Sequence, residues 1–270
     1  PVKPVWPSAP RRNKSIIIGL LAGLFVGTGI AFLTHLLRNG VDDPAEVEKH
    51  LGLPTYGTQV LMNVINETGA LPTRNHRDIQ FEGAHAISAE AMAEPRESDG
   101  KPNLVRNAAC FGCTIACGRI STVDRTHYTV AERPQYQIAS GGLEYEAAWA
   151  LGAATGVDDL DALTFANFIC NEQGFDPISF GATIGAAMEM YEDGIITDKE
   201  TGGIELKFGS AKALTDLAEL TGKGEGFGAE IGLGSKLLCE KYGHPEMSRA
   251  VPLKLVCKGL PAAMDATWVP

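Results

Sequence analysis

The sequence of 270 residues has few positive charges and lacks motifs that define several enzyme classes. Lysine and arginine total 23 against 33 aspartate and glutamate residues, and the resulting net charge of -10 argues against nucleic acid as a partner. No G-x-x-x-x-G-K-[ST] phosphate loop and no G-x-S-x-G nucleophile elbow occur. Gly224-Glu-Gly226-Phe-Gly228 resembles a dinucleotide loop in its letters, but the residues before it look helical, so a Rossmann fold is not expected.

Cysteine is sparse but unevenly distributed. Three of the six cysteines fall within the eight residues 110–117. Such short spacing argues against a secreted disulfide framework and favours metal binding in a reducing compartment. The remaining composition, with 44% hydrophobic and 21% charged residues, is ordinary for a globular protein with one large core or two domains.

Residues 15–37 contain no aspartate, glutamate, lysine or arginine. As a helix, this run would span about 34 Å, enough for the apolar core of a bilayer. Gly19, Gly23 and Gly27 share one face and would permit close helix packing in lipid. Basic residues flank both ends, and no small-residue cleavage site follows, so we expect a transmembrane helix rather than a signal peptide. A buried core helix is the alternative.

The pattern after residue 55 is mostly helical, so the expected fold class is mainly α. A polar loop is expected over 91–107, and a hairpin or long loop over 121–142. Cap residues and apolar stripes predict four helices: one capped by Asp158 or Asp159 and stopped by Gly174, one from Ser179 to Gly194, one from Ser210 to about Gly222, and one from about Gly228 to Gly243.

The cysteines form the pattern Cys110-x2-Cys113-x3-Cys117. Two thiolates separated by two residues converge from one turn, and a third four residues later can reach the same centre. Spacing alone favours a cubane iron–sulfur cluster and a structural zinc site equally. Either would take a fourth ligand, for which the candidates are Cys170, Cys239, Cys257, His127 and His244.

Residues 1–58 resemble one family of membrane proteins. The letters PVKPVWPSAPRRN, the apolar run and DDPAEVEKHLGLPTYG resemble the second transmembrane segment of polysaccharide chain-length regulators and bacterial tyrosine kinases. The resemblance implies that residues 38 onward are cytoplasmic, anchored to the inner membrane through 15–37. The excess of basic residues before the run would favour the opposite orientation.

The rest of the chain resembles a second family. The segments YGTQVLMNVINETGALPTRN, AACFGCTIACGR, LEYEAAWALGAATGVDDLDAL, NEQGFDPISFGATIGAAMEMYEDG and GEGFGAEIGLGSKLLCEKYGHPEM are similar, in this order, to the helical middle part of tungsten aldehyde:ferredoxin oxidoreductases. The resemblance implies a bis-pterin enzyme with tungsten (or molybdenum). Such an enzyme oxidises aldehydes to carboxylic acids and passes electrons through one 4Fe–4S cluster to ferredoxin or another electron-transfer subunit.

The resemblance assigns the metal and proton-transfer residues. Cys110, Cys113 and Cys117 match the three local cluster ligands of the family. Glu146, the second glutamate of Glu144-Tyr145-Glu146, matches an acidic residue beside tungsten, where it would transfer protons. Without the resemblance, Glu146 would equally be a solvated carboxylate at a helix start.

The resemblance also assigns pterin contacts. Asn171, Gly174 and Asp176 fall on a D-x-x-G-x-D element in which asparagine replaces the first aspartate. The amide of Asn171 can still accept a hydrogen bond but carries no charge. Arg74 and Asn75 fall near a pterin-facing loop of the family.

Two domains are therefore expected: residues 1–54, with the lead, the span and a short cytoplasmic exit, and residues 55–270, a helical iron–sulfur domain. Family parts expected before Tyr56 and after Pro270 are not found, so the chain by itself is not expected to oxidise aldehydes. The alternative functions are a membrane-anchored polysaccharide assembly regulator, or a chimeric or truncated chain without activity of its own.

Overall fold

The computed structural model describes residues 52–109, 111 and 117–249, together with residues 20, 21, 23, 24, 27 and 28. The chain divides into two compact units, Pro1–Val47 and Glu48–Pro270. In the first unit, the six described residues belong to the predicted span 15–37, and all six are helical and exposed; the rest of the span lies outside the described residues. Within the described ranges, no helix is long and apolar enough to cross a membrane.

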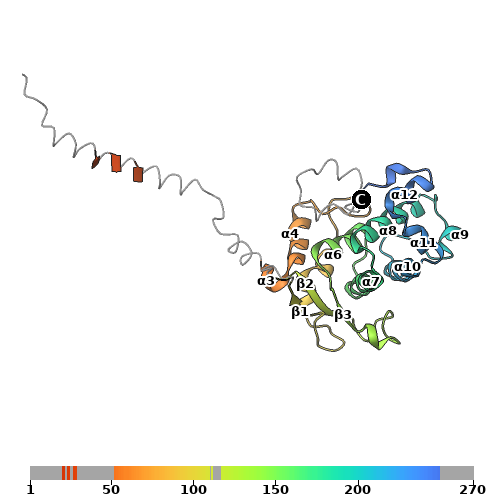
Figure 1. Cartoon of the computed structure of the whole chain (residues 1–270), viewed down its shortest axis with the longest axis horizontal. Helices are drawn as coiled ribbons and strands as arrows, with labels where there is room; N and C mark the ends of the chain where they lie inside the picture. Colours follow the sequence, from red (N-terminus) through yellow and green to blue (C-terminus); the bar gives the residue numbers. More distant parts are fainter. Residues whose placement is uncertain are drawn as a thin grey trace, which may run out of the picture. The chain divides into compact units, whose positions relative to one another are not determined.

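The second unit is mainly helical, as predicted (Figure 1). Ten α-helices are described there: α3 (Leu53–Tyr56), α4 (Leu61–Glu67), α5 (Ala89–Ala93), α6 (Tyr145–Leu151), α7 (Leu160–Gln173), α8 (Pro177–Glu192), α9 (Asp198–Thr201), α10 (Ala211–Lys223), α11 (Gly226–Ile231) and α12 (Gly234–Lys241).

Helix α8 forms the centre of the core. Every residue from 180 to 190 is buried, as expected for a mainly apolar helix that is covered on its sides by other helices. α6 and α12 pack against it, while α10 packs against α7 and α11. Gly181 and Gly185 permit the closest approach, since a Cβ atom would lie 2.3 Å from the Ala150 carbonyl oxygen and 2.8 Å from that of Ala154, respectively.

A small antiparallel sheet lies beside α7 (Figure 1). Its strands are β1 (Leu104–Ala108), β2 (Gly118–Thr122) and β3 (Ile138–Ser140), in the order β1-β2-β3. Ala108 is paired with Gly118, and Thr122 with Ile138. The cysteine segment therefore connects β1 to β2, and residues 123–137 connect β2 to β3.

Two predicted helix starts are confirmed by their caps. The Asp159 carboxylate accepts a hydrogen bond from the Ala162 N–H at 3.0 Å and begins α7, which ends at the left-handed Gly174. The Ser210 hydroxyl accepts one from the Ala213 N–H at 3.2 Å and begins α10. In both cases the signal is local, because the cap lies within one turn of the amides it satisfies.

Other boundaries were predicted wrongly. α8 begins at Pro177 with Asp176 as its cap, so Ser179 lies inside the first turn. The helix predicted over 228–243 is two helices, α11 and α12, separated at residues 232–233. The loop predicted over 91–107 contains the start of β1. Residues 121–142 combine both predicted alternatives, since a long loop joins two paired strands.

Candidate cluster site and its surroundings

The three predicted cluster ligands belong to the β1–β2 connection. Cys117 directly precedes β2 and is partly exposed, whereas Cys110 and Cys113 lie outside the described residues. Because Ala108 and Gly118 are partners across the two strands, the segment 109–117 leaves and re-enters the sheet at one point. In the part of the chain that the structure describes, no group of three or more His, Cys, Asp or Glu side chains could hold a metal ion.

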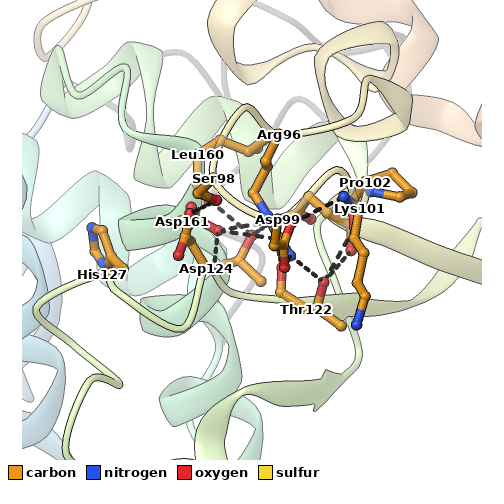
Figure 2. Close-up of polar contacts among 12 residues, drawn as sticks. Arg96, Ser98, Asp99, Lys101, Pro102, Thr122, Asp124, His127, Leu160 and Asp161 are labelled. Atoms are coloured by element: carbon orange, nitrogen blue, oxygen red, sulfur yellow. Dashed lines mark hydrogen bonds and ion pairs between the residues drawn. The ribbon is translucent and has the colours of Figure 1, made fainter.

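A polar network joins α7 to the end of β2 that lies opposite the cysteine segment (Figure 2). Arg96 donates from Nη1 to the Thr122 carbonyl oxygen at 2.9 Å and from Nη2 to Asp99 Oδ2 at 3.1 Å. The backbone N–H of Asp124 donates to Oδ1 of Asp161, in the first turn of α7, at 3.1 Å. The end of β2 opposite Cys117 is thus fixed to the helical core.

A buried cation follows Cys117. Arg119, in β2, is 1% exposed, and its Nη1 donates to Asn107 Oδ1 at 3.4 Å. Its Nε and Nη2 groups are buried and have no hydrogen-bond partner among the described residues. Burial lowers the pKa of Arg119 to about 10, against the opposing influence of Glu144 and then of Cys117. The guanidinium therefore remains protonated at neutral pH.

Glycines lie against the Arg119 side chain. Gly57 has a φ of 60°, and a Cβ atom there would lie 2.5 Å from Arg119 Nη2. At Gly142, whose N–H donates to the Arg119 carbonyl oxygen at 2.9 Å, a Cβ atom would lie 3.0 Å from Arg119 Cβ. An enclosed cation with unpaired donors has the charge and donors required by an anionic group, and a thiolate-bound iron–sulfur cluster is such a group.

The acidic pair lies at the start of α6. Glu144 is the N-cap residue, without a side-chain capping bond, and Glu146 lies half-buried in the first turn. Burial raises the pKa of Glu146, its backbone hydrogen bond lowers it, and the Glu144 charge raises it further. The hydroxyl of Tyr145, between them, is buried without a partner in the described ranges. A carboxyl group with a raised pKa suits proton transfer near neutral pH.

The predicted pterin element forms the corner between α7 and α8. Gly174 ends α7 with a φ of 79°, and the Asp176 carboxylate accepts from the Ser179 N–H at 2.6 Å to begin α8. Asn171 is exposed and donates from Nδ2 to the Gly141 carbonyl oxygen at 3.0 Å. Gly141 is followed by Gly142, whose N–H donates to the Arg119 carbonyl oxygen. These two glycines connect the corner to β2, the strand that carries Arg119. The three residues therefore have structural roles of their own.

Arg74 and Asn75 lie in a constrained turn. Arg74, Asn75 and His76 have positive φ values of 47°, 53° and 63°, a conformation that costs about 1–3 kcal/mol at each non-glycine residue. Asn75 is buried, and its amide donates to Glu189 Oε2 at 2.6 Å. The Arg74 guanidinium forms ion pairs with two carboxylates of nearby residues, Asp78 and Glu82. The hydrogen bond of Asn75 holds the turn in place. The two carboxylates already balance the positive charge of Arg74.

The sequence analysis assigned no role to two residues of this region, Arg119 and Gly57. Arg119 follows the last cysteine by two residues, and only its strand context shows that it points inward with Ser121. An alternation of apolar and polar letters would not reveal it, because arginine normally marks an exposed position. Gly57 becomes significant only through its distance to Arg119.

Comparison with known proteins places these features in a family. The model for "Aldehyde ferredoxin oxidoreductase, domains 2 & 3" matches residues 36–264. The tungsten-containing aldehyde ferredoxin oxidoreductase of Pyrococcus furiosus is 42% identical over 201 residues, covering 74% of this chain and 30% of that protein. The enzyme of the same name from Thermococcus kodakarensis is 40% identical over the same shares. The chain thus spans under a third of these relatives' length.

A second, partial likeness was found. The tyrosine-protein kinase ptk of Acinetobacter johnsonii is 28% identical over 96 residues, which is 32% of this chain and 13% of the kinase. This likeness covers much less of the chain than the first.

Proposed function

Because this chain belongs to the aldehyde ferredoxin oxidoreductase family, we propose that it is the iron–sulfur part of a tungsten-pterin enzyme and holds a 4Fe–4S cluster through Cys110, Cys113 and Cys117. The substrate would be an aldehyde, oxidised to a carboxylic acid, and the electron acceptor ferredoxin or another electron-transfer subunit. The observation that carries the proposal is the 42% identity to a tungsten-containing relative over 201 residues.

The chain's own residues fit such a cluster. The three cysteines share one connection between paired strands, and the enclosed Arg119 offers a positive charge beside Cys117. When bound, the tungsten (or molybdenum) bis-pterin would supply the oxidation chemistry and the cluster would supply single-electron transfer. Zinc bound by the same cysteines is the competing assignment.

Glu146 is proposed to hold and release the proton of the reaction. It lies in the first turn of α6, and burial raises its pKa. Asn171, Gly174, Asp176 and Arg74 are proposed pterin contacts. The exposure of Asn171 and Asp176 at the α7–α8 corner leaves polar atoms accessible to a ligand.

The cluster assignment is tested by cysteine variants of the full chain purified without oxygen. Cys113→Ser should lose most of the bound iron and acid-labile sulfide. Cys239→Ala is the matched control, because Cys239 is buried within α12; it should keep both, and a loss there would identify Cys239 as the fourth ligand. Far-UV circular dichroism of each variant separates loss of iron from loss of fold. Full iron and sulfide in Cys113→Ser would contradict the assignment.

We also propose that residues 15–37 form a membrane anchor with residues 38 onward on the cytoplasmic side. This proposal rests on the uncharged run and on the partial kinase likeness. Full-length protein that stays in solution without detergent would contradict it. A reporter fused at Gly40 that is active only in the periplasm would reverse the orientation.

A further inference from the structure

The turn Arg74–His76 has a backbone conformation that its own residues do not favour. All three residues have left-handed φ values, and none of them is glycine. Residues with a side chain adopt this conformation singly as a rule, because the Cβ atom comes close to the following carbonyl oxygen. Contacts from other parts of the fold must therefore hold the turn in place.

A buried carboxylate of α8 lies against this turn. Glu189 is 4% exposed and is the only charged residue in the buried run 180–190. Its Oε2 accepts a hydrogen bond from the Asn75 side-chain amide at 2.6 Å. Gly185, one helical turn earlier, lies on the same side of α8, since an added Cβ atom there would be 3.8 Å from Asn75 Cα. Packing alone would favour an apolar side chain at position 189.

Arg249 completes the network from a distant part of the chain. Its Nη2 group forms an ion pair with Oε1 of Glu189, and its Nη1 donates to the Asn75 carbonyl oxygen at 3.2 Å. The Asn75 amide also donates to the Met247 carbonyl oxygen at 2.8 Å. Both oxygens of the Glu189 carboxylate are therefore paired, and Asn75 is held through its side chain and its backbone at once.

We propose that Glu189 and Arg249 are positioning residues that impose the left-handed conformation on the Arg74–His76 turn and so fix Arg74 before a ligand binds. The inference rests on the proposed function, in which Arg74 contacts the pterin. A contact residue that is already fixed loses less conformational freedom on binding. We call Glu189 and Arg249 the clamp.

Hydrogen exchange of the full chain, followed by mass spectrometry of peptides, measures how firmly the turn is held. The reporter is the segment 73–78, in which the Asn75 N–H donates to the Ala154 carbonyl oxygen at 2.9 Å and the Arg77 N–H to that of Arg74 at 3.2 Å. Helix α10 is the internal reference, because it packs against α7 and α11.

The clamp is weakened by Glu189→Met, Glu189→Gln and Arg249→Lys. Methionine fills a similar volume without an acceptor, and the partly exposed Arg249 can then turn to solvent. Glutamine keeps one acceptor, and lysine keeps the charge but not the fork that reaches both Glu189 and Asn75. Arg77→Gln is the matched control, because Arg77 adjoins the turn and pairs with Glu192 of the same helix α8 at 3.0 Å, but both side chains are exposed.

Glu189→Met should raise the exchange rate of segment 73–78 by about tenfold, since hydrogen bonds to a charged group are lost, while α10 exchanges as in wild type. Glu189→Gln and Arg249→Lys should show smaller increases, and Arg77→Gln none. If Glu189→Met does not fold, Glu189→Gln decides. Wild-type exchange of the segment in the folded Glu189 variants, or an equal increase in Arg77→Gln, would overturn the inference.

A glycine–alanine pair at His76 tests whether the clamp imposes the conformation itself. With the clamp intact, His76→Gly should unfold at a higher urea concentration than His76→Ala, because a φ of 63° is strained for alanine and not for glycine. In the Glu189→Gln background the turn can relax, so this advantage of glycine should shrink or reverse. An advantage that is absent with the clamp, or unchanged without it, would overturn the inference.

Neither measurement needs a cluster or a pterin, so a negative result leaves the proposed function standing. Iron and acid-labile sulfide, measured in the same wild-type preparation, test that function separately.

Discussion

Replacing Gly181 by alanine should weaken the packing of α8 on α6. An alanine Cβ atom would lie 2.3 Å from the Ala150 carbonyl oxygen and 2.9 Å from the Leu151 nitrogen, whereas ordinary contacts begin at 3.4 Å. The atoms in the way belong to the backbone, so no side chain can rotate to relieve the overlap. The two helices must separate by about 1 Å, and a gap of that size forfeits up to about half of the dispersion energy of the atoms lining it.

The magnitude follows from two opposing effects. Overpacking a core costs about 1–3 kcal/mol, and here the upper end applies because the backbone must move. Alanine in place of glycine within a helix gains about 1 kcal/mol. We therefore expect Gly181→Ala to lower the free energy of unfolding by about 2 kcal/mol. Glu146 in α6 and Asp176 before α8 would be displaced relative to each other as well.

Urea titration followed by circular dichroism measures this change. Gly232→Ala is the matched control, because Gly232 has a φ of -59° and its nearest contact to an added Cβ atom is 3.4 Å. That variant should be as stable as wild type or slightly more stable. If Gly181→Ala unfolds at the same urea concentration as Gly232→Ala, the close approach of α8 and α6 is not as described.

Three further predictions concern titratable groups. Asp176→Ala removes the N-cap of α8 and should cost about 1 kcal/mol in urea titration, whereas Asp176→Asn keeps the acceptor and should cost less; equal losses would refute the capping role. Hydrogen bonds from Ser98 first and then from Thr126 lower the pKa of Asp124 from 3.8 to about 2, so the stabilising effect of its ionised form is complete above about pH 4 and is lost as the pH falls toward 2. Asp124→Asn should therefore flatten the acid-unfolding curve in that window, and an unchanged curve would contradict this. Burial raises the pKa of Glu146, so its ionised form destabilises the fold above that pKa; Glu146→Gln should stabilise the protein at about pH 8 more than at about pH 4, and a pH-independent effect would count against the raised pKa.

The elements that sequence predicts well are those determined by neighbouring residues. Asp159 and Ser210 begin their helices as predicted, because a cap acts within one turn. The start of α8 was missed because the predicted cap was Ser179, whereas Asp176 and Pro177 together form the better start signal. The division between α11 and α12 was missed although glycine is a weak helix former and Gly234, at the start of α12, has a left-handed φ of 80°.

The cluster ligands stay a prediction from the cysteine spacing, and the surroundings of Cys117 could not be predicted from the sequence. The cysteine spacing is readable because three thiols lie within eight residues, whereas the hairpin that carries them depends on pairing between β1 and β2 across the intervening segment. Arg119 could not be found from sequence, since the burial of a charged side chain is a property of the assembled fold. The role of Gly57 likewise depends on a contact between residues far apart in the chain.

The central claim is that Cys110, Cys113 and Cys117 hold an iron–sulfur cluster rather than zinc. The most direct measurement is the iron, acid-labile sulfide and zinc content of the wild-type chain purified without oxygen, with its absorption spectrum before and after reduction. The claim predicts iron and sulfide in equal amounts and an absorption near about 400 nm that bleaches on reduction. Stoichiometric zinc without sulfide would contradict it.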